Sequence, residues 1–221
     1  MDTYKMKFNT IIFDLDGTLL NTIDDLVENV NLVLKQQGYP VRTFTEIKSF
    51  IGDGIFMLIT RALPKDSTRQ EILRCFDIFT NYYLTNMYNH SKPYDGIIEL
   101  LKELKLRNIK TAVVSNKLDQ ATQKMCQHYF GDLISVAIGD NKERKRKPEP
   151  DNVLEALKQI GSTQEESVYV GDTKIDVETA RNSKLPVVGV SWGYRGRDEL
   201  SEAKADYIID EPWQLLEYMI N

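Results

Sequence analysis

Short apolar segments rich in β-branched residues recur along this chain, and they constrain its fold more than any other feature of the sequence. Buried strands are predicted at residues 10–13, 111–115, 134–138, 167–170, 187–191 and 207–209. Helical patterns at 96–107 and 150–160 alternate with these segments. Such alternation favours right-handed crossovers, so the sequence predicts an α/β fold, a Rossmann-like and mainly parallel sheet flanked by helices.

Residues 21–91 have a different pattern, without a convincing strand. Helices are predicted at 23–37, 45–50, 55–63 and 67–88, and their apolar stripes are interpreted as core rather than as a ligand site. The simplest arrangement is a helical domain of residues 21–91, inserted after the first strand. The core domain would then consist of residues 1–20 and 92–221.

Composition excludes several classes of function. The chain has 221 residues and a formal net charge of -5, which argues against a nucleic-acid binder. No apolar run reaches membrane-spanning length and no signal-peptide segment opens the chain, so we expect a cytoplasmic protein. Cys75 and Cys126 are interpreted as core residues, and His90 and His128 are too few for a zinc cluster. Enzyme chemistry would therefore have to rest on carboxylates.

Two aspartates, Asp14 and Asp16, follow the first predicted strand in the stretch TIIFDLDGTLL. A turn would account for Asp16 and Gly17, because Asp-Gly favours tight turns, but it would not account for Asp14. In an extended segment, residues two apart share one face, so the two carboxylates would repel each other. Such a pair is tolerated where a cation lies between the carboxylates or where one of them keeps a proton. The pair therefore indicates a hard metal ion, acid/base chemistry, or both.

Further polar residues stand at the ends of later predicted strands. Ser115 and Asn116 end the second strand, Asp172 and Thr173 follow the fourth, and Asp176 comes four residues later. In open α/β sheets, ligands bind beyond the carboxyl ends of the strands. We therefore expect these residues to meet the two aspartates at one edge of the sheet.

This set of residues fits phosphoryl transfer. Asp14 would be the nucleophile that forms an acyl phosphate, and Asp16 would protonate the leaving group and then deprotonate the attacking water. Mg²⁺ held by Asp14 and Asp172 would let the anionic phosphate approach. Asp176 would orient Asp172 or a metal-bound water, or would only stabilise a helix N-terminus. Ser115 would donate its hydroxyl and N–H to phosphate, or would only cap a turn.

A cation is also needed on the far side of the phosphoryl group, and the only dense supply is KERKRK at residues 142–147. Lys147 differs from its neighbours because Pro148 biases it toward an extended conformation directly before a predicted helix. We expect Lys147 to be held near the sheet edge. The rest of the run is interpreted as a solvated face or a nucleic-acid patch.

Four segments resemble, in this order, the motifs of the haloacid dehalogenase superfamily, in its phosphatase branch. They are DLDGTLL at 14–20, VVSNK at 113–117, KP at 147–148 and VGDTKID at 170–176. IGDG at 51–54 and GVSWGY at 189–194 are similar to segments of the phosphoglycolate phosphatase-like group. The resemblance implies that the helical insertion is a cap that closes over the site.

The resemblance also implies roles for individual residues. Mg²⁺ would be bound by the side chains of Asp14 and Asp172 and by the carbonyl oxygen of Asp16. Asp176 and Thr173 would contact these ligands and orient them. The expected substrate or phosphate contacts are Ser115, Asn116, Lys147, Gly52 and Asp53. The segment NSKLP at 182–186 departs from the Ala-Gly that many relatives carry there, and the basic run is unusually dense. Both departures leave the substrate subgroup open.

The sequence thus predicts a Mg²⁺-dependent phosphatase that hydrolyses a small-molecule phosphomonoester, similar to phosphoglycolate, through an aspartyl-phosphate intermediate. Alternatives of the same fold are a phosphomutase, a phosphonatase, a pyrophosphatase and a nucleotidase. A non-catalytic metal- or partner-binding module is a further alternative, although an EF-hand is excluded by the position of Gly17. The expected partner is a small phosphate ester, with no nucleic acid and no membrane, and the protein is expected to be a monomer or a homodimer.

Overall fold

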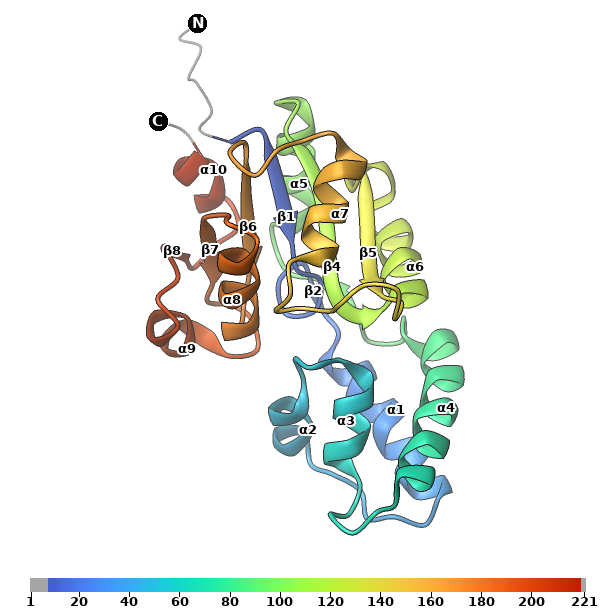
Figure 1. Ribbon diagram of the computed structural model, residues 1–221. Helices are drawn as coiled ribbons and strands as arrows, with labels where there is room; N and C mark the ends of the chain where they lie inside the picture. Colours follow the sequence, from blue (N-terminus) through green and yellow to red (C-terminus); the bar gives the residue numbers. More distant parts are fainter. Residues whose placement is uncertain (1–7, 220–221) are drawn as a thin grey trace, which may run out of the picture.

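The computed structural model describes residues 8–219, and its core is a six-stranded sheet (Figure 1). The strands are β1 (Thr10–Phe13), β4 (Lys110–Leu118), β5 (Val136–Asp140), β6 (Ser167–Gly171), β7 (Val187–Val190) and β8 (Tyr207–Ile209). They lie in the order β5-β4-β1-β6-β7-β8, and every neighbouring pair is parallel. The predicted Rossmann-like α/β fold is confirmed.

Helices cover both faces of this sheet. They are α5 (Ile97–Leu106), α6 (Asp119–Phe130), the short η1 (Gly131–Leu133), α7 (Asp151–Ile160), α8 (Lys174–Asn182), α9 (Gly196–Glu202) and α10 (Gln214–Met219). Ile11 and Phe13 of β1 belong to a buried cluster with α5, α6 and α10, whereas Ile12 belongs to a second cluster with α7, α8 and α9. This alternation along β1 follows from the two-residue period of a strand buried on both faces.

Four helices form a separate bundle beyond the carboxyl ends of the strands (Figure 1). They are α1 (Ile23–Gln36), α2 (Phe44–Phe50), α3 (Gly54–Ala62) and α4 (Arg69–Asn86). Thr43 and Thr68 begin α2 and α4 with capping boxes, which satisfy N–H groups at the first turn. Across residues 8–219, no helix combines the length and the apolarity that a membrane span requires.

The two chain segments that join the bundle to the core lie side by side. They pair as the antiparallel strands β2 (Leu20–Asn21) and β3 (Lys92–Pro93), which the sequence did not predict. Each strand has only two residues, too few for a recognisable alternating pattern. The strand β2 crosses the expected boundary at 20/21, whereas β3 begins directly after the expected boundary at 91/92. The division into residues 1–20 with 92–221 and residues 21–91 stays a prediction.

The strand β4 is longer than expected. It continues beyond Ser115 to Leu118, with a register shift against β5 between Val114 and Leu118. Ser115 and Asn116 therefore lie in the irregular end of the strand rather than behind it. An irregularity of this kind redirects side chains at the end of a sheet, where this chain carries its polar residues.

Candidate active site

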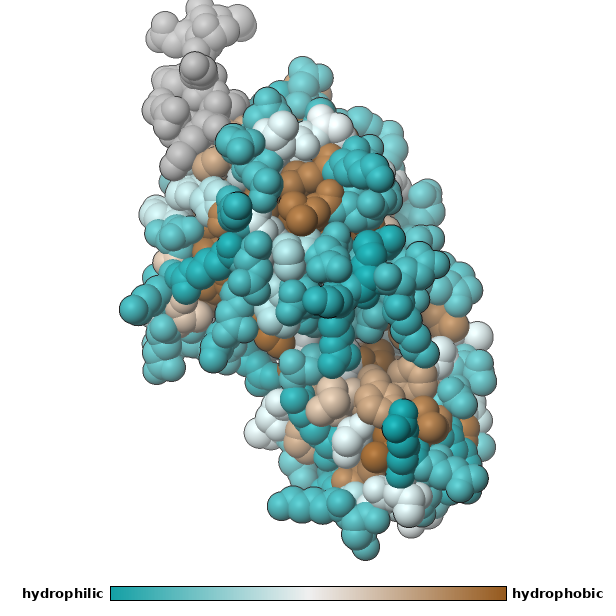
Figure 2. Space-filling model, viewed as in Figure 1, coloured by the Kyte–Doolittle hydropathy of each residue, from teal (hydrophilic) through white to brown (hydrophobic). Residues whose placement is uncertain are grey.

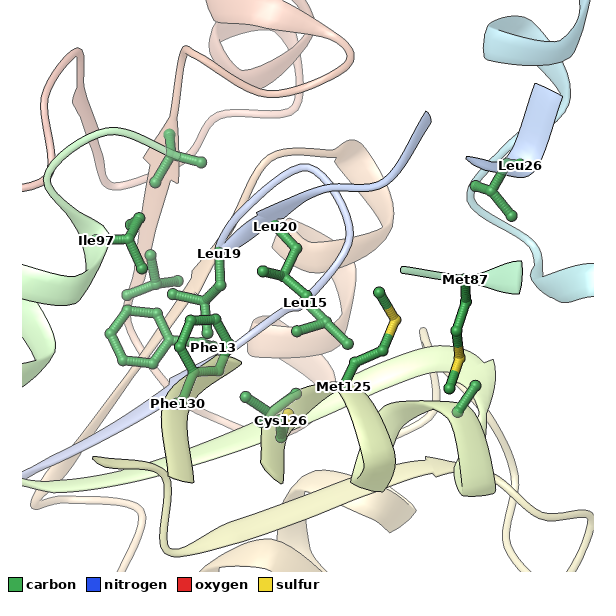
Figure 3. Close-up of a cluster of buried hydrophobic side chains, with 14 of the residues drawn as sticks. Phe13, Leu15, Leu19, Leu20, Leu26, Met87, Ile97, Met125, Cys126 and Phe130 are labelled. Atoms are coloured by element: carbon green, nitrogen blue, oxygen red, sulfur yellow. The ribbon is translucent and has the colours of Figure 1, made fainter. Parts of the chain in front are cut away.

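The loop that carries the two aspartates is fixed by its own apolar residues. The carbonyl oxygen of Leu15 accepts hydrogen bonds from the N–H groups of the next turn, at Thr18, Leu19 and Leu20. The side chains of Leu15, Leu19 and Leu20 are buried and belong to one apolar cluster with Met125 and Cys126 of α6 (Figure 3). Gly17 has a φ of 88°, a conformation that favours glycine. The apolar half of the motif therefore anchors its polar half at the sheet edge.

Asp14 and Asp16 pair with different cations. In an extended segment both carboxylates would instead have shared one face and one cation. The chain turns after Phe13, and each carboxylate meets its own lysine. Lys147 Nζ lies 2.8 Å from Asp14 Oδ1, and Lys117 Nζ lies 2.8 Å and 3.1 Å from the two carboxylate oxygens of Asp16. The sequence reasoning missed Lys117, although the residue lies in the segment VVSNK.

Asp14, Asp172 and Asp176 form a buried carboxylate cluster, with one oxygen atom from each lying within 4.8 Å of the others. Asp172 accepts hydrogen bonds from the backbone N–H of Tyr194, at 2.8 Å, and from the Thr18 hydroxyl, at 3.2 Å. The two bonds use different carboxylate oxygens, so each oxygen of Asp172 keeps a further lone pair for another contact. The expected convergence of these three aspartates at one sheet edge is what the structure contains.

Two glycines make room for the Asp172 carboxylate. A Cβ atom added at Gly17 or at Gly193 would overlap that carboxylate. Close approach of backbone to a functional group is a common reason for glycine in a loop. The two loops that carry Gly17 and Gly193 thus form a tight cradle around Asp172.

Asp176 is held by the start of α8. Its carboxylate accepts hydrogen bonds from the backbone N–H of Thr173, at 3.0 Å, and from the Thr173 hydroxyl, at 2.7 Å. It also lies 2.7 Å from Lys147 Nζ. Both sequence interpretations of Asp176 therefore describe the same side chain, because it closes a capping box at α8 and also belongs to the buried cluster.

Lys147 is fixed at both of its ends. Its backbone N–H donates to Asn116 Oδ1 at 2.9 Å, and Asn116 Nδ2 donates to the Lys147 carbonyl at 3.1 Å. Burial alone would lower the pKa of the Lys147 ammonium, but Asp14 and Asp176 more than offset this effect and hold the pKa well above its usual value. Lys147 is therefore charged, and Asn116 acts here as the residue that positions it.

The cluster carries more negative charge than Lys147 can neutralise. Burial raises the pKa of Asp14 to about 7, against the attraction of Lys147 and with repulsion from Asp176 and Asp16. Burial and the neighbouring carboxylates also raise the pKa of Asp172. Asp14 Oδ1 is buried and accepts no hydrogen bond, its close contact with the Lys147 charge aside. Oxygen ligands with surplus charge fit a hard divalent cation such as Mg²⁺.

A pocket lies between the sheet edge and the helical bundle. Figure 2 shows apolar surface on the bundle where it faces the polar surface of the core. The core side of the pocket is lined by Asp14, Asp16, Ser115, Asn116, Lys117, Lys147, Thr173, Ile175, Tyr194 and Arg195. The bundle side is lined by Leu26, Ile51, Gly52, Gly54, Ile55 and Leu58. The carboxylates and the cations thus meet an apolar wall.

The two residues predicted from the segment IGDG lie in different places. The Gly52 carbonyl accepts a hydrogen bond from Asn116 Nδ2 at 3.1 Å, and Gly52 lines the pocket. The Asp53 carboxylate pairs instead with Arg61 and lines a neighbouring depression. A phosphate contact by Asp53 stays a prediction.

Comparison with known proteins identifies a matching family and similar proteins. A family model described as haloacid dehalogenase-like hydrolase matches residues 11–190. A phosphoglycolate phosphatase from Aquifex aeolicus (strain VF5) is 32% identical over 216 residues, which are 96% of each chain. Pyrophosphatase PpaX from Listeria monocytogenes (serotype 4a) is 28% identical over 213 residues, which are 95% of each chain. The crystal structure of a predicted phosphoglycolate phosphatase from Haemophilus somnus is 30% identical, with a TM-score of 0.89 over 96% of this chain and 98% of that chain.

Proposed function

The chain belongs to the family of haloacid dehalogenase-like hydrolases and is a phosphoric monoester hydrolase, and we propose that its substrate is a small phosphomonoester similar to phosphoglycolate. We further propose that the reaction depends on Mg²⁺ and proceeds through phosphorylated Asp14. The single observation that carries the proposal is the buried Asp14 carboxylate beside Lys147 and Asp172, at the floor of a pocket under the helical bundle.

In the proposed first step, an oxygen of Asp14 attacks phosphorus. The new bond joins this oxygen to phosphorus, and the bond from phosphorus to the ester oxygen breaks. Asp16, which in this step must carry a proton in the substrate complex, gives that proton to the departing alkoxide. In the second step Asp16 takes a proton from water, the water oxygen bonds to phosphorus, and the bond to Asp14 breaks. Inorganic phosphate leaves and both aspartates return to their starting states.

The remaining residues would bind and orient. Side-chain oxygens of Asp14 and Asp172 and the carbonyl of Asp16 would hold Mg²⁺, which supplies charge neutralisation on the phosphoryl oxygens when it is bound. Thr173 would keep Asp176, and through it Lys147, in place. The residues proposed to contact substrate or phosphate are Ser115, Asn116, Lys147, Gly52 and Asp53.

The apolar bundle side of the pocket supports a cap role for α1–α4. A closed cap excludes water, which strengthens the attraction between Lys147 and a phosphoryl group. Cytoplasmic residence, a monomeric or homodimeric state and the lack of nucleic-acid and membrane partners remain parts of this proposal. A pyrophosphatase is the second candidate, because a relative with that name matches over 95% of the chain.

Phosphate release from a panel of substrates tests the proposal. The metal-free protein should release phosphate only after Mg²⁺ is added, with Ca²⁺ as a control cation that prefers longer bonds and more ligands. The panel contains 2-phosphoglycolate, inorganic pyrophosphate, nucleoside monophosphates and sugar phosphates, and we expect the highest kcat/KM with 2-phosphoglycolate. Highest turnover of pyrophosphate would favour the second candidate, and no release from any compound would refute the phosphatase proposal.

Mg²⁺ binding should tighten as the pH rises through about 7, because Asp14 must lose its proton before it can bind a cation. Below that pKa, each pH unit should change the Kd by roughly tenfold for each proton displaced. Titration calorimetry at about pH 6 and about pH 8 measures the change. Asp172→Asn is the control, since loss of a ligand should weaken binding at both pH values. A Kd that is independent of pH would contradict the prediction.

A further inference from the structure

Lys117 had no predicted role, yet its ammonium is among the most completely surrounded groups of the site. Its side chain is 1% exposed. Its three N–H bonds match three acceptors, the carboxylate oxygens of Asp16 at 2.8 Å and 3.1 Å and the Tyr83 hydroxyl oxygen at 2.5 Å. A fully buried lysine is rare without such partners. Lys117 therefore joins Asp16 to Tyr83 and has no N–H left over.

Tyr83 belongs to a different part of the molecule from the other two residues. It lies on α4 of the helical bundle, whereas Asp16 and Lys117 lie in the loop after β1 and in β4. Its side chain is fully buried, its ring stacks on Phe79 with centroids 5.2 Å apart, and Lys117 Nζ lies 4.8 Å from the centre of that ring. Burial, and then repulsion from Asp16, raise the pKa of the Tyr83 phenol well above its usual value. Tyr83 is therefore a neutral acceptor held rigidly by the bundle.

We propose that Tyr83 and Lys117 act as a tether that positions the Asp16 carboxyl from the helical bundle. Both are positioning residues, since they act on the reacting groups only through Asp16. The inference rests on the proposed function, in which Asp16 exchanges protons with the leaving group and water. It adds that the placement of this carboxyl depends on contact between bundle and core.

The geometry explains why the tether matters for Asp16. Thr22 donates one hydrogen bond, at 2.6 Å, to a single oxygen of this carboxylate, so it leaves the carboxylate free to rotate about that contact. Lys117 contacts both oxygens and thereby fixes the plane of the carboxylate. Movement of α4 away from the core would remove the Tyr83 acceptor from a buried ammonium, and an unpaired buried N–H is costly. Lys117 would then shift, and Asp16 would shift with it.

Tyr83→Phe tests the tether, because it removes one oxygen atom and keeps the ring that packs on Phe79. Two substrates are compared by kcat/KM, which reports the steps up to departure of the first product. An alkyl phosphate needs a proton on its leaving group, whereas the p-nitrophenolate of p-nitrophenyl phosphate leaves without one. We expect kcat/KM to fall about tenfold for the alkyl phosphate and by less than about twofold for p-nitrophenyl phosphate.

Tyr82→Phe is the matched control. Tyr82 precedes Tyr83 on α4, is half-buried, and its hydroxyl takes no part in the contacts of Lys117. This variant should leave both kcat/KM values within about twofold of the wild type. Lys117→Met is a second test of the tether, with a larger selective loss on the alkyl phosphate than Tyr83→Phe.

The outcomes separate the tether from the proposed function. Equal losses on both substrates in Tyr83→Phe would mean that Tyr83 only supports the fold, and no loss on either would mean that it does not act on Asp16. Either result overturns the tether while Mg²⁺-dependent turnover by the wild type stands. Failure of the wild type to hydrolyse both substrates would instead overturn the proposed function.

Discussion

Asp14→Asn should abolish Mg²⁺-dependent phosphate release, with kcat reduced by at least about 10⁴-fold. The substitution keeps the size and shape of the side chain. It replaces an anionic oxygen nucleophile by a neutral amide, which forms no stable bond to phosphorus. It also weakens one proposed ligand of Mg²⁺, so turnover should be measured at saturating Mg²⁺ to isolate the chemical step. Residual release is then compared with the wild type at equal enzyme concentration.

Asp66→Asn is the control for Asp14→Asn, because Asp66 is an exposed aspartate of the loop before α4. That variant should keep full activity. A direct measurement is the acyl phosphate itself. Borohydride reduces such a group to an alcohol, so enzyme quenched during turnover should carry homoserine at position 14 by mass spectrometry. Most activity retained in Asp14→Asn, or homoserine at another aspartate, would refute the nucleophile assignment.

The sheet and its polar edge could be predicted from the sequence for a physical reason. Strands buried on both faces need continuous apolar runs, and parallel strands place the residues that follow them at one edge. This rule brought Asp14 and Asp172 together although they are 158 positions apart in the numbering. Asp176 was expected beside Asp172 because it stands at the start of the next helix; it lies in the first turn of α8, whereas Asp172 precedes the N-cap Thr173.

The partners of the carboxylates could not be predicted in the same way. Contact between Lys117 and Tyr83 depends on how the bundle sits against the core, and neither residue has a local pattern that encodes it. Asp53 is a similar case. The segment IGDG predicts a position near the site, but the Asp53 carboxylate pairs with Arg61, eight residues later. The sequence offered no clear signal for Lys117, because its neighbours Ser115 and Asn116 are polar and the predicted strand ended before it.

Replacement of Lys147 should have the largest effect on stability. Lys147→Met keeps the apolar stem but removes the charge that lies 2.8 Å from Asp14 and 2.7 Å from Asp176. Removal of one partner of a buried ion pair typically costs about 3–5 kcal/mol. The free energy of unfolding of the metal-free protein should therefore fall by about this amount at about pH 8, as measured by urea denaturation. Phosphatase activity should also be lost, because the proposed phosphate contact disappears.

The difference in the free energy of unfolding between Lys147→Met and the wild type should depend on pH. A carboxyl whose folded-state pKa is raised binds its proton more tightly when folded, so its contribution to stability falls as the pH rises toward that pKa and then levels off. For Asp14 in the wild type this fall ends near pH 7, because Lys147 opposes the effect of burial. Without Lys147 the fall should continue to higher pH, so the difference between Lys147→Met and wild type should widen above about pH 7.

Lys145→Met is the matched control for Lys147→Met, since it removes one charge from the same basic run at an exposed position. It should change the free energy of unfolding by less than about 0.5 kcal/mol and leave the activity unaltered. A stability difference of Lys147→Met that stays constant from about pH 6 to about pH 9 would mean that Lys147 stabilises the fold through Asp176 and Tyr169 alone. A stability difference that widens with pH would mean that the Lys147 charge interacts with the ionised Asp14 carboxylate, as the proposed reaction requires.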